Sequence, residues 1–214
     1  MIQRFGVLGS GQVGQTLARG LGKHGYQVMI GSRTPAKLAE FGKASGIATG
    51  TFAEVATWAE ALVLAVAGTA AQQVLDEAGR ASLEGKLVID VTNPIAPEPP
   101  DDGVIRFFTG PNESLMERLQ RTFPDARFVK AFSCVGNAHM VNPSFPDGKP
   151  TMFYCGNDAA AKQDVARLLE QFGFDLADMG TAAGARAIEP LCQLWCIPGM
   201  RGGGWNHAFR LLRK

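Results

Sequence analysis

The chain has 214 residues, with 21 basic and 20 acidic side chains and a formal net charge of +1 at pH 7. This length fits one domain, or one domain with a small appendage, and it is long enough to bury a sizeable core. The near balance of charge gives no indication of a nucleic-acid or anionic-membrane partner.

The first 33 residues organise the rest of the chain. An apolar run over residues 4–8 predicts a strand, and a glycine turn with the sequence GSGQVG follows at residues 9–14. Apolar residues then recur at helical spacing, Gly25 is placed as a C-terminal cap, and residues 26–30 form a second apolar run. Strand, tight turn, helix and strand in this order are the context in which G-x-G-x-x-G indicates a dinucleotide site.

Each glycine of the turn has a physical role. Gly9 permits the sharp turn, Gly11 lets a pyrophosphate approach the backbone, and Gly14 lets the helix lie close to the strand. The start of the helix adds unpaired N–H groups and a partial positive charge, which favour a diphosphate. We therefore expect a bound dinucleotide; the alternative is a glycine-rich turn in another kind of α/β protein.

The end of the second strand indicates which dinucleotide binds. An NAD site usually places Asp or Glu there to accept a hydrogen bond from the ribose 2′-hydroxyl, whereas a cation accommodates a 2′-phosphate. This chain has Ser32 and Arg33 at that point, with Lys37 one helical turn later. One hydroxyl and two cations suit a phosphate dianion, so the sequence predicts NADP(H). The alternative is a solvated basic turn.

Strands and helices alternate after this unit. The expected helices span 35–44, 53–59, 70–81 and 113–122, and the expected strands span 50–52, 61–66, 86–90 and 127–132. The unbroken apolar run at 61–66 is typical of a parallel strand that is buried on both faces. This alternation predicts an α/β protein with a parallel, doubly wound sheet and its ligand at the carboxyl ends of the strands.

Two polar loops, at 96–103 and 142–150, interrupt the later part of the chain. Beyond them we expect a strand at 151–155, a helix at 159–172, a strand at 174–179 and a long helix at 182–195. Pro198 and the glycines up to Gly204 are expected to break the chain before a last helical turn at 205–212. We place a domain boundary near residue 143, so that 1–142 is the dinucleotide-binding domain and 143–214 a small C-terminal α/β appendage for substrate or dimerisation.

The cysteines show no paired C-x-x-C spacing and the three histidines are scattered, so no metal site is expected. We expect reduced thiols and a cytoplasmic protein. Cys134 is expected to fill space, because no neighbouring cation would lower its pKa. The first strand begins so close to Met1 that no signal peptide is expected, and the apolar stretch 61–71 is too short to span a bilayer.

Four segments together resemble a known family: GSGQVG at 9–14, VMIGSR at 28–33, DVTNP at 90–94 and VKAF at 129–132. They resemble the NADP oxidoreductases that exchange hydride with the deazaflavin coenzyme F420, and the reductase domain of the STEAP metalloreductases is similar too. The likeness covers nearly the whole chain, and its most specific part is the Gly-Ser-Arg ending at Arg33. It agrees with a Rossmann fold, which is doubly wound and mainly parallel, and it implies NADP(H) as cofactor and a homodimer.

The resemblance also implies a role for each matching position. The implied cofactor contacts are Ser10, Gln12 and Val13 at the diphosphate; Ser32, Arg33 and Lys37 at the 2′-phosphate; Val66, Ala67 and Ala70 along the dinucleotide; and Asn93, Pro94 and Asn137 near the nicotinamide. The stretch 132–135 would face the hydride acceptor. Within it, Ser133 stands where the deazaflavin enzymes have His.

The residues leave the acceptor open. Hydride transfer between a nicotinamide and a flavin-like ring depends on holding two carbons close and excluding water, so it requires no general acid. The candidates for the acceptor pocket are Ser133, Val135, His139, Trp205 and His207. His139 follows the sixth strand near the expected cleft, or is a surface loop residue. Trp205 and His207 could close over the site, or belong to a helix that packs on a dimer partner.

We therefore expect an NADPH-dependent oxidoreductase that passes hydride to a small-molecule acceptor, either a flavin or coenzyme F420. One alternative is an imine or carbonyl reductase on the same scaffold, which would need a proton donor within hydrogen-bond reach. The other is a non-catalytic NADP(H) sensor, since one fold serves many functions. Both enzyme hypotheses require a cleft of acceptor size beside Asn93, Ser133 and Trp205.

Overall fold

In the computed structural model, which describes residues 2–213, eight strands form one sheet in the order β3-β2-β1-β4-β5-β6-β7-β8. The strands are β1 Arg4–Leu8, β2 Gln27–Gly31, β3 Ala48–Gly50, β4 Ala61–Leu64, β5 Leu87–Asp90, β6 Arg127–Lys130, β7 Thr151–Gly156 and β8 Asp175–Asp178. All neighbours from β3 to β6 are parallel, β7 is antiparallel to β6, and β8 is parallel to β7. The expected α/β class with a doubly wound, mainly parallel sheet is confirmed. The expectation about the start of the chain at Met1 lies outside the described residues.

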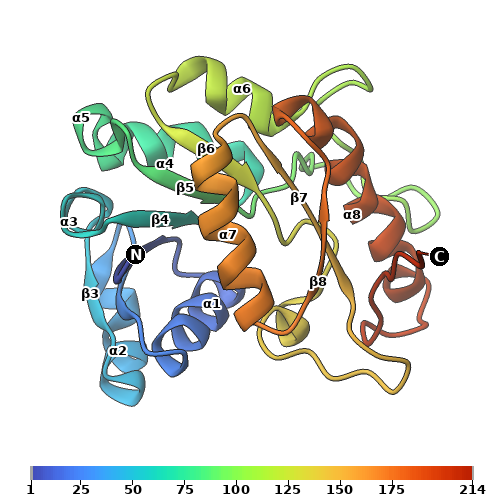
Figure 1. Cartoon of the computed structure of the whole chain (residues 1–214), viewed down its shortest axis with the longest axis horizontal. Coiled ribbons are helices and arrows are strands. Elements are labelled where there is room, and N and C mark those ends of the chain that lie inside the picture. Colours follow the sequence, from blue (N-terminus) through green and yellow to red (C-terminus); the bar gives the residue numbers. More distant parts are fainter. Residues whose placement is uncertain (1, 214) are drawn as a thin grey trace.

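Helices cover both faces of this sheet. They are α1 Gln12–Lys23, α2 Ala39–Ser45, α3 Phe52–Trp58, α4 Ala71–Ala78, α5 Arg80–Leu83, α6 Leu115–Thr122, α7 Ala159–Gln171 and α8 Ala185–Met200. One apolar core cluster contains side chains of α1, α2 and α7, and a second contains side chains of α3, α4, α6 and the start of α8. Figure 1 shows α7 lying across the near face of the sheet.

The central strands are buried at every position, as the apolar runs predict. All residues of β4 and β5 are buried, and in β1 the neighbours Val7 and Leu8 belong to different core clusters. Successive side chains of a strand point to opposite faces, so a strand between two helix layers needs apolar residues throughout. Burial of both faces leaves only the strand ends available for a ligand.

Two expected boundaries in the first half of the chain are wrong. The strand expected at 50–52 is β3, which ends at Gly50, because Thr51 caps α3. The Thr51 hydroxyl accepts from the Glu54 backbone N–H at 3.2 Å, and the Glu54 carboxylate accepts from the Thr51 N–H at 2.7 Å. This reciprocal capping box starts a helix where we expected a strand. The helix expected at 70–81 is divided into α4 and α5 at Gly79, whose φ is 89°.

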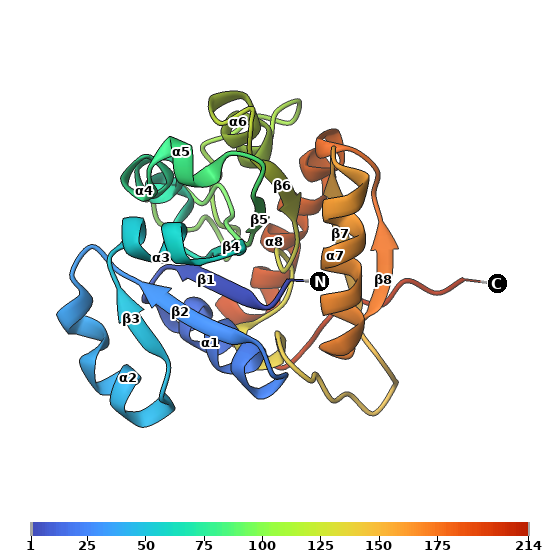
Figure 2. The same cartoon turned by 60° about the vertical axis from the view of Figure 1, so that its left-hand side comes forward.

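The end of the chain also differs from expectation. Pro198 does not break the long helix, because α8 continues to Met200. A proline removes one backbone hydrogen bond, and the burial of side chains such as Trp195 on this helix offsets that loss. Residues 205–212 form no helix: the Thr151 N–H donates to the Phe209 carbonyl at 2.9 Å, so this tail lies along the start of β7. Figure 2 shows it running past β8.

The division into 1–142 and 143–214 stays a prediction. In the structure β7 hydrogen-bonds to β6 within the same sheet, and α7 packs in the same apolar cluster as α1. Every helix of the described residues is too short or too polar to cross a lipid bilayer.

Candidate functional site

A cleft of about 810 Å³ lies at the carboxyl ends of β1, β2, β4 and β5. Most of the cofactor contacts expected from the sequence line it: Gly9, Ser10, Gly11, Gln12, Val13, Ser32, Arg33, Lys37, Val66, Ala67 and Ala70. Its other lining residues, which the sequence analysis missed, are Thr34, Phe52, Ala65, Val74 and Val91. Ala65 and Val91 directly follow β4 and β5, so the rule that ligands bind at the carboxyl ends of strands could have found them.

The three glycines of the turn differ in what surrounds them. Gly9 has a φ of 135°, and a Cβ there would lie 2.1 Å from the Ala65 carbonyl oxygen. Gly14 lies outside the lining, where a Cβ would be 2.1 Å from the Gly9 carbonyl oxygen. Gly11 has open space on its Cβ side within 4 Å. Gly9 and Gly14 therefore serve the close packing of α1 on the sheet, and Gly11 leaves room for a ligand against the backbone.

The start of α1 faces this open space without a side-chain cap. Gly11 is the N-cap residue and provides no side chain to accept from the first N–H groups of the helix. Gln15 donates from its side chain to the Ser10 carbonyl at 2.9 Å and so holds the turn. Backbone N–H groups at a helix start, together with the helix dipole, bind anions such as a diphosphate.

The end of β2 provides a hydroxyl and two cations. Ser32 is buried; its hydroxyl accepts from the Thr34 N–H at 3.1 Å, and its own N–H donates to the Gly50 carbonyl. Arg33 and Lys37 are exposed along the cleft, and neither forms an ion pair with a carboxylate of residues 2–213. Their charges are available to a dianion, which is the arrangement expected for a 2′-phosphate.

Asn93 and Ser133 meet beyond the cleft lining, where β5 and β6 end. The Asn93 side-chain amide donates to the Ser133 carbonyl at 3.1 Å. Asn93 Oδ1 and Ser133 Oγ are both buried and have no hydrogen-bond partner among the described residues. A buried polar atom without a partner costs free energy, so this pair fits a polar group brought by a ligand. Pro94 is buried beside Asn93, whereas Asn137 is exposed at the start of the short 3₁₀ helix η3, Asn137–His139.

Two of the five candidates for the hydride-acceptor pocket, Trp205 and His207, pack against α8. The ring of His207 stacks on Trp195 with centroids 4.9 Å apart, and its Nε2 lies 2.8 Å from the Trp195 carbonyl oxygen. Trp205 lies 5.4 Å from the Trp195 ring and covers Gly199, where a Cβ would meet the indole at 2.4 Å. The sequence analysis missed Trp195, whose ring contacts both Trp205 and His207.

The loop after β6 approaches the same aromatic group from the other side. A Cβ on Gly136 would lie 2.9 Å from the Trp195 ring, so the segment that contains the buried Ser133 and Val135 runs up to this ring. His139 is directed elsewhere, with its ring 4.7 Å from that of Phe145. Four of the five candidates are therefore on segments that meet at Trp195, and His139 is not.

Cys134 is enclosed in an apolar cluster with Cys192, Trp195 and Cys196. Burial raises the pKa of the Cys134 thiol to about 12, so the thiol is protonated at neutral pH. All four cysteines are free and buried. Within residues 2–213, no group of three His, Cys, Asp or Glu side chains is arranged to hold a metal ion.

Three charged side chains that the sequence analysis missed are buried between β5, β6 and α8. Lys130 Nζ lies 2.7 Å from Asp90 Oδ2 and 2.9 Å from Glu189 Oε1, and all three side chains are at most 1% exposed. Desolvation alone would lower the pKa of Lys130, but the two carboxylates outweigh it and raise that pKa. No local sequence signal links Glu189 to Lys130, because only the fold brings α8 beside β6.

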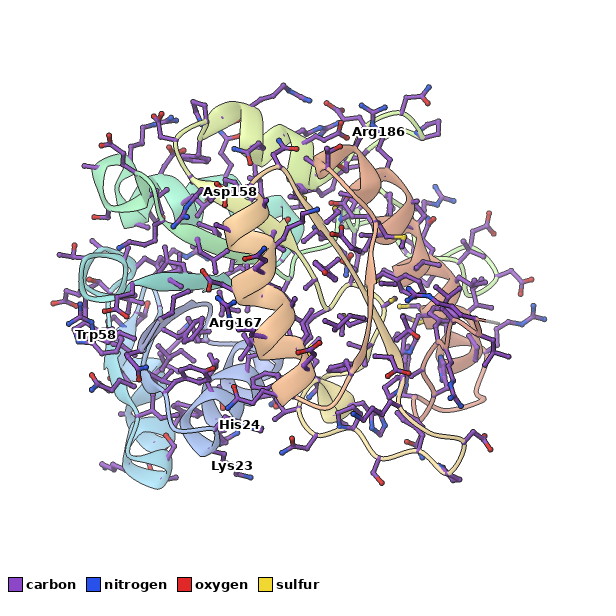
Figure 3. The ribbon with its side chains drawn as sticks, in the orientation of Figure 1. Lys23, His24, Trp58, Asp158, Arg167 and Arg186 are labelled. Carbon is purple, nitrogen blue, oxygen red and sulfur yellow. The ribbon has the colours of Figure 1, made fainter. Side chains whose placement is uncertain are left out.

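His24 lies at the opposite end of α1 from the glycine turn, where it forms the C-cap. Its Nε2 is 3.1 Å from Asn142 Oδ1. Figure 3 shows Lys23 and His24 near the lower end of α7, with Arg167 higher on that helix. His24 thus lies at the C-terminus of α1 and outside the lining of the cleft.

Comparison with known proteins gives a family model and a solved structure that matches the chain from end to end. A family model described as NADP oxidoreductase, coenzyme F420-dependent, matches residues 4–94. A crystal structure from Arthrobacter sp. FB24, provisionally described as an F420-dependent NADP reductase, has 34% identity and a TM-score of 0.92, and each chain covers 100% of the other.

Other relatives are longer or more distant. Metalloreductase STEAP3 of Rattus norvegicus is 32% identical over 200 residues, which are 91% of this chain and 38% of that protein. Metalloreductase STEAP2 of Homo sapiens is 33% identical over 187 residues, 87% of this chain and 35% of that protein. The chain thus spans little more than a third of the length of these relatives. An imine reductase of Streptomyces aurantiacus shares the fold, with 20% identity, a TM-score of 0.68 and coverage of 92% of this chain and 63% of that one.

Proposed function

The chain belongs to the family of coenzyme F420-dependent NADP oxidoreductases, and from this premise we propose that it transfers hydride between NADP(H) and a ring acceptor of the flavin or deazaflavin type. That it is an NADP-dependent oxidoreductase follows from the family. The identity of the acceptor is the proposal, and the imine reductases with the same fold are too distant in sequence to decide it.

The observation that carries the proposal is the set of partners that the cleft leaves open. The start of α1 has uncapped N–H groups for a diphosphate, and Arg33 and Lys37 supply charge for a 2′-phosphate. Beyond the cleft lining, where we propose that the nicotinamide binds, Asn93 Oδ1 and Ser133 Oγ are buried polar atoms without partners among the described residues. An amide oxygen that accepts and a hydroxyl that can donate or accept match a carboxamide, the polar group of a nicotinamide.

The residues of the chain bind, orient and exclude water. Bound NADPH supplies a hydride from its nicotinamide ring, so the protein has to hold that ring against the acceptor. Asn93 and Ser133 can fix the rotation of the ring through its carboxamide. Trp205 is 45% exposed and packs on the buried Trp195 next to the loop after β6, so its aromatic surface suits a flat ring. No step of this transfer requires one of the histidines to donate a proton.

The experiment that tests the proposal follows NADPH oxidation by absorbance with four acceptors in turn: free flavin, a deazaflavin, a ferric chelate, and small imines or carbonyl compounds. We expect turnover with a flavin or the deazaflavin. The ferric chelate is included because two relatives are named metalloreductases. Turnover with imines or carbonyls alone would replace the proposal by a reductase of those groups, and NADPH binding without turnover of any acceptor would indicate a sensor.

We also propose that the protein acts as a homodimer in the cytoplasm, with neither nucleic acid nor a membrane as partner. Exposed apolar side chains on α8 support the dimer; these are Leu194 and Met200. The free cysteines support a reducing compartment. Sedimentation equilibrium of the purified protein tests the dimer, and a single species of monomer mass would contradict it.

A further inference from the structure

The buried cluster of Lys130, Asp90 and Glu189 has a third attachment. Besides the two carboxylates, Lys130 Nζ donates to the backbone carbonyl of Thr92 at 2.7 Å. Thr92 is itself tied to the cluster, because its N–H and its hydroxyl donate to Asp90 Oδ1 at 2.9 and 2.6 Å. The residue that follows is Asn93, whose side chain reaches the Ser133 carbonyl. Lys130 thus holds the residue that directly precedes Asn93, a proposed nicotinamide contact.

The other proposed nicotinamide contact, Ser133, lies near Lys130 in the sequence. Two residues separate Lys130 from Ser133, and one of them, Phe132, has a φ of 63°. A bulky residue in the left-handed region is strained, and such strain persists only where the surroundings enforce it. The Phe132 N–H is turned toward Met152 Sδ at 3.1 Å, and Phe132 is buried. The backbone that presents Ser133 is therefore held in an unfavourable conformation between fixed points.

The cluster satisfies its own charges. Glu189 accepts from the N–H groups of Leu115 and Met116, at 2.8 and 3.0 Å, so it caps the start of α6. One ammonium group and a helix start then face two carboxylates, so each buried charge lies against an opposite charge, while Asp90 Oδ2 is paired with Lys130 by charge without a hydrogen bond. A buried ion pair contributes little to stability compared with apolar packing of the same volume. Its presence at this point therefore calls for a role other than stability.

We propose that Lys130 is a positioning residue for hydride transfer: by holding the Thr92 carbonyl it fixes Asn93 against Ser133, and so orients the nicotinamide. This inference rests on the proposed function. It differs from a purely structural role in one measurable respect. A positioning defect affects the nicotinamide half of the cofactor and spares the adenosine half, which binds about Arg33.

Isothermal titration calorimetry with two ligands tests the nicotinamide and adenosine halves of the cofactor site separately. NADPH occupies the whole site, and adenosine 2′,5′-bisphosphate occupies only the adenosine half. For Lys130→Met we expect the affinity for NADPH to fall about tenfold, the scale of a lost hydrogen bond from a charged group, and the affinity for the bisphosphate to change less than about twofold. The rate of hydride transfer to the best acceptor should fall in parallel with the loss of NADPH affinity or by more.

Lys162→Met is the matched control. Lys162 on α7 has the same kind of partners, with Nζ 2.9 Å from Asp178 Oδ2 and 3.2 Å from the Gly180 carbonyl oxygen, but it lies outside the cleft. We expect this variant to change neither affinity by more than about twofold, because it removes a partly exposed pair far from the ligand.

Lys130→Met leaves two buried carboxylates without their cation and could prevent folding. The variant with Asp90→Asn, Lys130→Met and Glu189→Gln removes all three charges together, so no buried charge stays unpaired, while the bond to Thr92 is still lost. The same selective loss of NADPH affinity is expected. An equal loss for both ligands, or no loss for either, would overturn the positioning role. Failure of the wild-type protein to bind either ligand would overturn the proposed function, and this inference with it.

Discussion

We propose that the choice of cofactor depends on Arg33. It is exposed on the lining of the cleft, next to the buried Ser32, and it has no carboxylate partner among residues 2–213. An Asp or Glu at this strand end would repel a 2′-phosphate, whereas a guanidinium can bind it with two parallel hydrogen bonds.

Replacing Arg33 with Ala should weaken NADPH binding by about 1.5–3 kcal/mol, the scale of hydrogen bonds to a charged group, and should leave NADH binding nearly unchanged. Fluorescence titration with both cofactors measures the difference. Lys23→Ala is the control, because Lys23 ends α1 at the opposite end from the glycine turn (Figure 3). Equal losses for NADPH and NADH would contradict a contact between Arg33 and the 2′-phosphate.

Gly11 and Gly14 allow a second test at the residue scale. A Cβ at Gly11 would have open space within 4 Å, so Gly11→Val should fold with nearly the wild-type melting temperature and yet lose both NADPH and NADH, since it fills the proposed space of the diphosphate. Gly14→Ala should instead lower the melting temperature, because its Cβ would lie 2.1 Å from a carbonyl oxygen. Calorimetry and cofactor titration together separate the two effects. Retained binding in Gly11→Val would show that the turn is not the diphosphate site.

At the scale of elements, an ion pair joins α6 to α8. Arg186 at the start of α8 donates to Glu117 on α6 at 2.6 Å, and Figure 3 shows Arg186 where α8 begins beside α6. This hydrogen bond with Arg186 is the main reason that the pKa of Glu117 falls to about 2; burial opposes it and bonds from Ser114 add to it. A carboxylate with a lowered pKa in the folded state stabilises that state above its unfolded pKa, and the stabilisation is lost as the pH falls toward the folded value.

Arg186→Met should therefore reduce stability at pH 7 and make it less dependent on pH between about 4.5 and 2, the interval between the unfolded and folded pKa values of Glu117. Urea unfolding at a series of pH values measures this. Arg167→Met removes another arginine with a carboxylate partner, Asp164, at the exposed side of α7, and should leave the pH dependence close to that of the wild type. The same acid-dependent loss in wild type and Arg186→Met would contradict the assignment.

At the scale of the whole molecule, the tail connects the end of the chain to the segments that we propose face the hydride acceptor. Trp205 and His207 pack on Trp195 of α8, the loop after β6 meets the same ring, and Phe209 then pairs with the start of β7. The position of Trp205 is thus decided by contacts with distant segments and not by helical propensity in the tail.

Trp205→Ala should raise the KM for the acceptor several-fold and leave the affinity for NADPH unchanged, because the indole belongs to the acceptor side and not to the lining of the cofactor cleft. Steady-state kinetics with the acceptor found by the screen, together with NADPH titration, measure both. Leu212→Ala is the control on the same tail, where the side chain is 79% exposed. An unchanged KM for the acceptor would remove Trp205 from the site.

The sequence by itself determined the sheet class and predicted most of the residues that line the cleft. The β1–turn–α1–β2 unit is local: its apolar runs, its three glycines and the Ser32-Arg33 ending lie within 33 residues, so their spacing alone predicts strand, helix and ligand. What only the tertiary structure decided depends on residues far apart in the chain. Lys130 forms an ion pair with Glu189, which is 59 positions later in the chain. Trp195 contacts both the loop after β6 and the tail, and the tail is extended because it pairs with Thr151. A partner that arrives from a distant segment leaves no period or spacing in the sequence near a residue, and for that reason the contacts of Asn93 with Ser133, of Lys130 with Glu189 and of Trp195 with Trp205 became visible only in the fold.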